Sequence, residues 1–506
     1  MRRSLTDQRL FFWLNISAVI TALLLALVEL PRTPLPWGDE MLLVSTAAAI
    51  RDGNPGIPSV LNAFPHTGRV DLFEGSVPFW VGAASLKIFG LSLWSWRSIC
   101  WFFGVALVFA SAWTVLLLGA PKTHAALASA LVTFSPALGS SLTSGRLDTL
   151  TVACEMLAVC LLISKPSLTR SLFAGLLLGA ASLSTPRAQP FMVSLFAVAL
   201  AYAILQRNML FLRGLVFSGA TAALCVCAWT LYVGLNPWSW LRLVLAVSSG
   251  DKTNSSPMLG GSWGGFDVRV NSFGLIVPTI IAVWLALFLV RRVHDRQRLG
   301  TAGALLIALL VNAGLTVILT SRTLSYEMFW LVPLIPVVVA VTAIYEPDMK
   351  PSSSPLFGVL MALLLVTLLV RCGKVGEVFI SWRSRDPHPI TEFICDNVPR
   401  HSTVYGPADF YYYGVEQCGS RYLYPQQWIA VGLVSPLDSP PHMEGTFLIW
   451  PAGEPVTVNV KMHESARFRP VGGRARKGSS QSKTGLIDRV LRYTGGYPET
   501  VLYKIE

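Results

Sequence analysis

Eleven long apolar segments constrain the fold of this chain more than any other feature of its sequence. They lie at residues 10–30, 97–118, 123–140, 146–164, 171–185, 188–205, 212–234, 273–290, 301–320, 326–345 and 355–371. Charged residues make up only 13% of the 506 residues, and the mean hydropathy is +0.55. So few charges could not cover the surface of a soluble protein of this length. We therefore predict a polytopic α-helical membrane protein with about eleven transmembrane helices.

The basic residues predict the orientation of these helices. Arg2, Arg3 and Arg9 precede the first apolar segment, which places the N-terminus in the cytoplasm. Further basic residues fall on alternate loops: Lys122, Lys165, Arg170, Arg207, Arg213, Arg291, Arg292, Arg296 and Arg298. The loops at 31–96 and 235–272 and the C-terminal tail are then external. Because membrane topology accounts for the net charge of +12, this charge does not indicate a nucleic-acid partner.

Two segments need separate treatment in this topology. The first apolar segment is too long for a cleavable signal peptide and lacks a small-residue cleavage site, so we expect it to be retained. Residues 77–90 are apolar enough to be counted as a twelfth span. A crossing there would turn the basic cluster at 291–298 outward, so we predict a juxtamembrane or re-entrant helix, with a short tilted crossing as the alternative.

The chain divides into a membrane domain, residues 1–374, and an external tail, residues 375–506. Short β-like runs occur at 403–405, 446–450, 456–460 and 501–505, and helical stretches at 389–397 and 485–493. These patterns predict a small α/β domain. Its basic Gly/Ser-rich stretch at 467–483 is interpreted as a solvated loop. Cys395 and Cys418 lie in this tail, and an oxidising compartment would permit them to form a disulfide.

Two adjacent carboxylates, Asp39 and Glu40, follow the first span and its Trp37-Gly38 pair. The predicted topology places them on the external face, at the boundary between lipid and water. Leu42, Ala47 and neighbouring apolar residues predict an amphipathic helix that begins at Asp39. Asp39 could simply cap this helix. A carboxylate placed there could also take a proton from an acceptor hydroxyl, and this second reading also accounts for Glu40.

Three short external loops each carry one arginine: Arg146, Arg187 and Arg322. Arginine at a membrane boundary is costly without a partner, and its guanidinium can bind phosphate through two parallel hydrogen bonds. We therefore interpret these arginines as candidate phosphate ligands. For Arg146, a structural pair with Asp148 remains the alternative, and the other two arginines could instead extend toward lipid headgroups.

The order of several motifs resembles GT-C glycosyltransferases, in the branch (families 39 and 83) that contains protein O-mannosyltransferases and the lipid A aminoarabinose transferase. Asp39-Glu40 follows the first span, and residues 89–97 (FGLSLWSWR) look like the family's "fGxsxxaxR" stretch. Residues 146–150 (RLDTL) look like its "RxD" element, and residues 330–336 (WLVPLIP) are similar to its "YxLPxxP" run. The resemblance covers residues 10–345 and rests on motif order, because no single motif is specific.

This resemblance implies an inverting transfer of a sugar from a polyprenyl-phosphate donor on the external face. Asp39 is then the catalytic base, Glu40 supports it or the acceptor, and Arg146 contacts the donor phosphate. The family's late tyrosine is replaced by Trp330, with Tyr326 one helical turn earlier, which leaves that lipid-phosphate contact in question. His66 and Glu74 shape the acceptor side in this interpretation, with a structural role as the alternative. These residues, with Trp37 and Asp148, form the predicted substrate pocket.

The expected partners are a polyprenyl-phosphate-linked sugar, membrane lipids and a lipid, glycan or protein acceptor. The expected location is the bacterial inner membrane. The sequence determines neither the sugar nor the acceptor, and it leaves a divalent-metal requirement open. A glycan polymerase or ligase that uses a diphosphate-linked donor remains an alternative. A transporter is a second alternative, although the predicted spans contain few acidic residues and the sequence has no internal repeat. A structural or assembly protein would need no Asp-Glu pair beside outward arginines.

Overall fold

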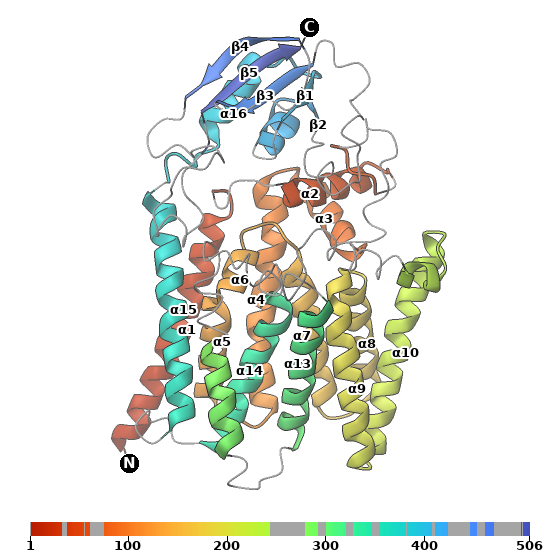
Figure 1. Ribbon diagram of the computed structural model, residues 1–506, viewed down its shortest axis with the longest axis vertical. Coiled ribbons are helices and arrows are strands. Elements are labelled where there is room, and N and C mark those ends of the chain that lie inside the picture. The colour runs from red at the N-terminus through yellow and green to blue at the C-terminus, as the bar shows by residue number, and fades with distance from the viewer. Residues whose placement is uncertain are drawn as a thin grey trace.

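The structure is a computed structural model in which a bundle of long helices carries a small β-sheet domain at one end (Figure 1). It describes residues 2–32, 38–54, 56–60, 75–242, 279–291, 300–319, 327–346, 354–380, 382–406, 410–423, 446–452, 461–469, 497 and 499–505. The N-terminus lies at the end of the bundle opposite the sheet domain, and the C-terminus lies within that domain (Figure 1).

The long helices run roughly side by side along the bundle (Figure 1). Their bounds are α1 Arg2–Glu29, α4 Leu93–Leu117, α5 Lys122–Phe134, α7 Asp148–Ile163, α8 Leu168–Ser182, α9 Gln189–Leu205, α10 Met209–Tyr232, α13 Gly300–Leu319, α14 Glu327–Tyr345 and α15 Pro355–Ile380. A further helix spans Thr279–Arg291.

Six of the described segments are long and apolar enough to cross a membrane, so the chain is a multi-pass membrane protein. These segments are Gln8–Glu29, Leu93–Leu117, Pro186–Leu205, Met209–Tyr232, Glu327–Tyr345 and Pro355–Ile380. Apolar helices of 10–17 residues occur at Val77–Phe89, Leu168–Ser182, Thr279–Arg291 and Gly300–Thr316. The count of eleven spans goes beyond these six and stays a prediction.

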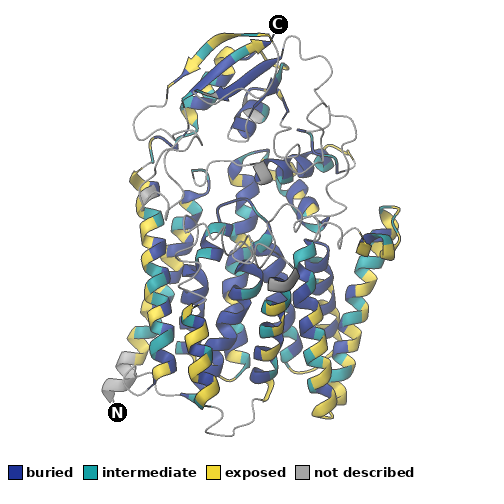
Figure 2. Cartoon of the chain, in the orientation of Figure 1, coloured by how far each residue is buried: buried dark blue, intermediate teal, exposed yellow. Residues whose placement is uncertain are grey.

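Burial follows the position of each helix in the bundle (Figure 2). α5 and α14 are buried along most of their length, because they lie at the centre of the bundle and contact several other helices. Large apolar side chains remain exposed on the outer helices, for example Leu24 on α1, Val193 on α9 and Leu224 on α10. Exposed apolar surface of this extent is what a lipid-facing surface requires.

The structure corrects two of the predicted helix boundaries. The span expected at 123–140 is broken at Ser135 into α5 and the short helix α6, Pro136–Ser141. Ser135 adopts an extended backbone and its Oγ accepts a hydrogen bond from Leu138 N at 3.2 Å, so it caps a new helix whose first residue is proline. The span expected to begin at residue 97 begins four residues earlier, which places Arg97 inside α4.

Two short helices, α2 (Gly38–Arg51) and α3 (Val77–Phe89), lie between the bundle and the sheet domain (Figure 1). α3 packs against α2 and α4. Its 13 residues reach about 20 Å, whereas a hydrocarbon core is about 30 Å thick. This length favours the prediction that residues 77–90 do not cross the membrane.

The sheet domain contains helix α16 (His388–Asn397) and a mixed sheet with strand order β2-β1-β3-β5-β4. The strands are β1 Thr403–Tyr405, β2 Arg421–Leu423, β3 Phe447–Pro451, β4 Met462–Phe468 and β5 Thr500–Ile505. β1 is parallel to β2 and β3, whereas β5 is antiparallel to β3 and β4. A disulfide joins Cys395 on α16 to Cys418.

Most of the described part of this domain agrees with the predicted α/β pattern. Strands at 403–405, 446–450 and 501–505 and the helix at 389–397 are confirmed. The strand expected at 456–460 and the helix at 485–493 lie outside the described residues. The basic stretch expected to be a loop begins within β4, where Arg467 pairs with Glu464 at 2.9 Å. α15 continues through residue 374 to Ile380.

The predicted orientation has a direct test. Reporter fusions placed after residue 260 and after residue 400 should both report an external location, because both points follow an odd number of predicted crossings. A fusion after residue 294, within the basic cluster, is the matched control and should report the cytoplasm. A cytoplasmic signal at either of the first two points would contradict the eleven-span arrangement.

Candidate functional site

Helix α2 carries the two adjacent carboxylates at its start, at the end of the bundle that meets the sheet domain (Figure 1). Asp39 and Glu40 are its second and third residues, and the side chain of Asp39 lies outside the described part of the structure. Leu42 and Ala47 are buried, which confirms the predicted apolar face of this helix. That face packs into a buried cluster that also contains residues of α4 and of the sheet domain.

Glu40 forms a fully buried ion pair with Arg97 of α4. Arg97 Nε donates to Glu40 Oε1 and Arg97 Nη2 to Glu40 Oε2, both at 2.6 Å, and both side chains are 0% exposed. Arg97 Nη1 also donates to the carbonyl of Leu30 at 2.8 Å, just beyond α1. Burial raises the pKa of Glu40, and the Arg97 charge opposes that rise. The pair thus ties α2 to α1 and α4.

The stretch that resembles the family motif builds the geometry of this ion pair. Gly90 ends α3 with φ +76°, a conformation that favours glycine. Ser92 and Ser95 then form a reciprocal capping box that starts α4. Arg97 follows one turn inside the helix, where it reaches Glu40. The motif residues therefore set the point at which α4 begins.

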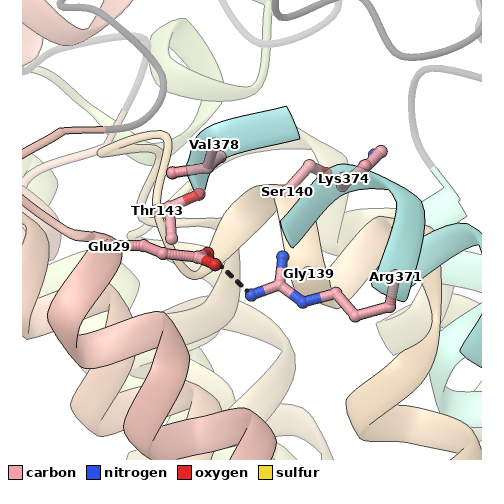
Figure 3. A pocket seen from close by; sticks show the side chains of 7 residues that line it. All are labelled: Glu29, Gly139, Ser140, Thr143, Arg371, Lys374 and Val378. Atoms are coloured by element: carbon pink, nitrogen blue, oxygen red, sulfur yellow. Dashed lines mark hydrogen bonds and ion pairs between the residues drawn. The ribbon is translucent and has the colours of Figure 1, made fainter. Parts of the chain in front are cut away.

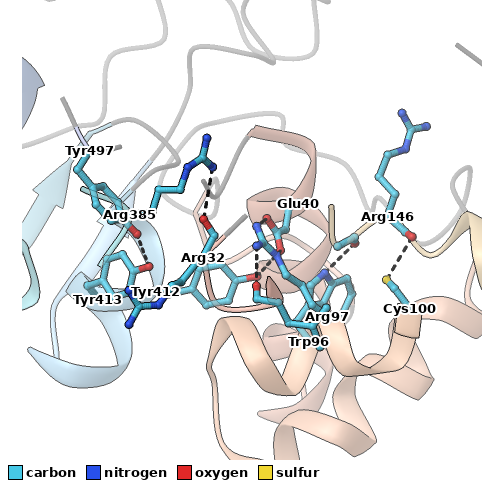
Figure 4. Close-up of polar contacts among 12 residues, drawn as sticks. Arg32, Glu40, Trp96, Arg97, Cys100, Arg146, Arg385, Tyr412, Tyr413 and Tyr497 are labelled. Carbon is cyan, nitrogen blue, oxygen red and sulfur yellow. Dashed lines mark hydrogen bonds and ion pairs between the residues drawn. The ribbon is translucent and has the colours of Figure 1, made fainter. Parts of the chain in front are cut away.

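The loop that carries Arg146 lies directly against this ion pair (Figure 4). Gly145 has φ +71°, and a Cβ atom at this position would overlap the Glu40 carboxylate. Trp96 Nε1 donates to the Gly145 carbonyl at 2.8 Å, and the Cys100 thiol donates to the Arg146 carbonyl at 3.2 Å. The structure thus brings Arg146 beside Glu40, although 106 positions separate them in the sequence.

Arg146 and Asp148 form an ion pair, with Nε and Oδ2 at 3.1 Å. Their side chains are 24% and 15% exposed, so both remain accessible. Asp148 is the first residue of α7, where the helix dipole favours a negative charge. The pair predicted as the structural alternative for Arg146 is therefore present. It leaves the phosphate role untested, because one guanidinium can bind more than one anion.

The sheet domain contributes Tyr412 to the same site (Figure 4). Its Oη donates to Glu40 Oε1 at 3.4 Å, and the residue is 2% exposed. Burial and the nearby Glu40 carboxylate raise the pKa of Tyr412 well above its ordinary value. The hydroxyl therefore keeps its proton and acts as a donor.

The other predicted site residues fall into two groups. Arg187 lies in a short turn, Pro186–Ala188, next to Ala188, which belongs to the buried cluster around α2. Trp330 is half-buried on α14 and packs against the core of the membrane bundle. The remaining candidates lie outside the described residues: Trp37, His66, Glu74, Arg322 and Tyr326. Within the described ranges, no group of three or more His, Cys, Asp or Glu side chains could hold a metal ion.

A second buried ion pair lies between α1 and α15, beside a small pocket (Figure 3). Arg371 Nη2 donates to Glu29 Oε2 at 3.0 Å, and Glu29 Oε1 is buried without a hydrogen-bond partner. The pocket is lined by Glu29, Gly139, Ser140, Thr143, Arg371, Lys374 and Val378. Thr143 connects this pocket to the Arg146 loop, only three residues further along the chain.

The partners in these contacts were not predicted from the sequence. Arg97 ends the stretch at residues 89–97 that resembles the family motif, and an arginine at the start of an apolar segment is a signal that a buried acid lies opposite it. Glu29 and Arg371 are likewise charged residues at the ends of apolar segments, 10–30 and 355–371, where each needs a partner of opposite charge. Tyr412 carries no comparable signal, because its side chain is uncharged and a largely buried tyrosine is ordinary in a domain core.

Loss of Arg97 should destabilise the protein strongly. Arg97→Gln leaves the buried Glu40 carboxylate without its counter-charge, which is expected to lower the free energy of unfolding by roughly 3–5 kcal/mol. Thermal unfolding of the purified protein measures this loss. Arg170→Gln, at an exposed position on α8, is the matched control and should unfold as wild type. Glu40→Gln combined with Arg97→Gln should recover part of the loss; a further decrease would contradict the ion-pair explanation.

The comparisons with known proteins concern the fold. No sequence-family profile matches the chain, and no curated protein matches it by sequence. ArnT from Cupriavidus metallidurans bound to undecaprenyl phosphate is similar to it in structure, with a TM-score of 0.54, 11% identity and 97% of each chain covered. The apo structure of ArnT is also similar, with a TM-score of 0.52 and 13% identity over 87% of this chain and 93% of that chain.

Archaeal oligosaccharyltransferase AglB from Archaeoglobus fulgidus is a more distant match, at a TM-score of 0.46 and 11% identity over 87% of this chain and 69% of that chain. The fold assignment depends on the ArnT structures alone. The undecaprenyl-phosphate-bound structure covers 97% of this chain, which includes the sheet domain. The chain therefore has the fold of ArnT, a GT-C membrane glycosyltransferase.

Proposed function

We propose that this protein is an inverting glycosyltransferase that moves a sugar from a polyprenyl-phosphate donor to an extracytoplasmic acceptor. The observation that carries the proposal is the packing of the Arg146 loop against the start of α2, at the end of the bundle that meets the sheet domain. An acid at position 39 and a guanidinium at position 146 are the two groups that such a transfer needs. The ArnT-like fold supports the same class of reaction.

Asp39 is the proposed base. It accepts the proton of an acceptor hydroxyl while the hydroxyl oxygen attacks the anomeric carbon of the donor sugar. The bond from that carbon to the phosphate oxygen breaks, and the polyprenyl phosphate leaves with the bonding electrons. The attack comes from the face opposite the leaving group, so the configuration at the anomeric carbon inverts.

Arg146 is the proposed ligand of the departing phosphate. Negative charge grows on the phosphate as the bond breaks, and a fixed guanidinium stabilises that charge. The ion pair with Asp148 holds Arg146 in position, and both side chains stay partly exposed. Arg187, on a neighbouring turn at the same end of the bundle, is a second candidate for this phosphate, as is Arg322.

Glu40 has a supporting role in this proposal. Both of its carboxylate oxygens are engaged by Arg97, and its side chain is fully buried, so it does not face an acceptor. It is instead the anchor that fixes the first turn of α2. Because Asp39 precedes it directly on the helix, this anchor determines where the proposed base lies.

A panel of labelled donors tests the proposal. Membranes that contain the wild-type protein are incubated with different sugars on polyprenyl phosphate, and with the same sugars on polyprenyl diphosphate. Transfer from at least one monophosphate donor is expected, with no transfer in the Asp39→Asn variant. Use of diphosphate donors alone would favour the glycan polymerase or ligase alternative instead.

A further inference from the structure

The sheet domain is packed into the candidate site rather than merely attached to the membrane bundle. One buried apolar cluster contains Met41 and Val44 of α2 together with Phe410 and Tyr411 of the sheet domain. Tyr412 of this domain donates a hydrogen bond to Glu40 Oε1 of the buried ion pair. The domain and the ion pair are therefore linked both by this hydrogen bond and by the shared apolar cluster.

The turn that carries Tyr412 is fastened at its far end by the disulfide. Cys418 follows Tyr412 by six residues, and its bond to Cys395 ties the turn to α16. Cys418 N also donates to the Tyr413 carbonyl at 3.2 Å, within the π-helical segment Tyr413–Gln417. Segments of this type are rare and occur frequently at functional sites.

Other contacts hold the ring and the start of the turn in place. The hydroxyl groups of Tyr413 and Tyr497 are hydrogen-bonded to each other (Figure 4). The rings of Tyr411 and Tyr412 meet edge to face at 5.4 Å. Strands β1 and β2 pair in parallel on either side of the turn, so its two ends are fixed in the sheet. The Tyr412 hydroxyl thus reaches Glu40 from a rigid support.

We propose that Tyr412 is a positioning residue of the transfer site, supplied by the sheet domain, and that the Cys395–Cys418 disulfide holds its turn in place. This inference rests on the proposed function. Tyr412 fixes the Glu40 carboxylate from one side while Arg97 fixes it from the other. Glu40 in turn fixes the first turn of α2, which carries Asp39. Loss of either the hydroxyl or the disulfide should therefore misplace the base while leaving donor binding intact.

Three variants of the full-length protein in lipid nanodiscs test the inference: Tyr412→Phe, the double variant Cys395→Ser/Cys418→Ser, and their combination. Tyr412→Phe removes one hydroxyl and keeps the ring. The Tyr412–Glu40 contact is a long hydrogen bond to a charged group, and the low end of the usual range for such bonds corresponds to about a factor of ten. We therefore expect kcat to fall about tenfold with KM for the donor unchanged. Tyr503→Phe, the same change on β5, is the matched control and should behave as wild type.

The combined variant separates positioning from general stability. If the disulfide acts through Tyr412, its removal should lower kcat in the wild-type background and add little in the Tyr412→Phe background. Two independent, additive losses would overturn the proposal. Wild-type kcat in Tyr412→Phe would overturn it as well.

Hydrogen–deuterium exchange gives a readout that does not depend on catalysis. Peptides that cover α2 should exchange faster in Tyr412→Phe and in the double cysteine variant, while β3 and β5 keep their protection. If wild type uses no donor in the panel, the proposed function fails, and exchange in α2 alone decides whether the sheet domain fixes this helix. Unchanged exchange in α2 would then refute the coupling. If the double cysteine variant does not fold, the Tyr412→Phe result decides.

Discussion

Asp39→Asn is expected to abolish sugar transfer while the protein still folds and inserts. The amide has nearly the shape of the carboxylate, but it cannot accept the proton of the acceptor hydroxyl. A general base contributes about 10²–10⁴-fold to a rate, so kcat should fall by that factor. The unfolding temperature should stay close to that of wild type, because Asp39 is not part of the buried ion pair between Glu40 and Arg97.

The matched control for this variant is Asp52→Asn. Asp52 directly follows α2 and pairs with Arg51 at 2.8 Å on the protein surface, so the same chemical change is made near the other end of the same helix. It should leave transfer unchanged. Near-normal turnover of Asp39→Asn would mean that Asp39 only caps α2 and that the base lies elsewhere. If Asp39→Asn lost activity only because less of the protein stayed folded, the conclusion would be the same.

The second large effect is expected at Arg146. Arg146→Ala should be close to inactive yet folded, because the departing phosphate loses its guanidinium. Arg146→Lys keeps the charge but loses the two parallel hydrogen bonds, so it should retain partial activity with a slower transfer or weaker donor binding. Transfer rate against donor concentration distinguishes these two effects. Arg170→Lys, at an exposed position in the first turn of α8, is the matched control.

Asp148→Asn separates the phosphate role of Arg146 from its ion pair. Arg146 Nε lies 3.1 Å from Asp148 Oδ2, so the asparagine removes the partner charge but leaves the guanidinium free to bind phosphate. If Arg146 binds the donor, Asp148→Asn should be milder than Arg146→Ala. If Arg146 serves only the pair, both changes should lower the unfolding temperature equally, and the surviving protein should transfer sugar at the normal rate.

Local patterns in the sequence predicted those features that depend on near neighbours. The apolar face of α2 and the strands at residues 403–405 and 446–450 follow from periodicity within a few residues. The break at Ser135 was missed even though a proline follows it, because the apolar run continues on both sides. Strand β2 is as short as β1 but was not predicted, because Arg421 and Leu423 favour a strand less than Thr403 and Val404 do.

The contacts that define the site could not be derived in this way. Glu40 and Arg97 are 57 residues apart, and Tyr412 and Glu40 are 372 residues apart, so their pairing depends on how whole helices pack. Sequence alone identified the two carboxylates and Arg146 as unusual for their position. It identified Asp148 as a possible partner of Arg146, two residues away, but not Arg97 as the partner of Glu40, because that pairing depends on which side chains are buried together in the folded protein.

The most direct test of the proposed function uses a donor that is labelled in both its sugar and its phosphate. The purified protein in proteoliposomes receives a polyprenyl-phosphate sugar and an acceptor, and the two labels are followed separately. The proposal predicts that the sugar label moves to the acceptor with inverted configuration, while the phosphate label stays on the polyprenol as its monophosphate. Movement of both labels together across the membrane, without cleavage, would instead identify a transporter and contradict the proposal.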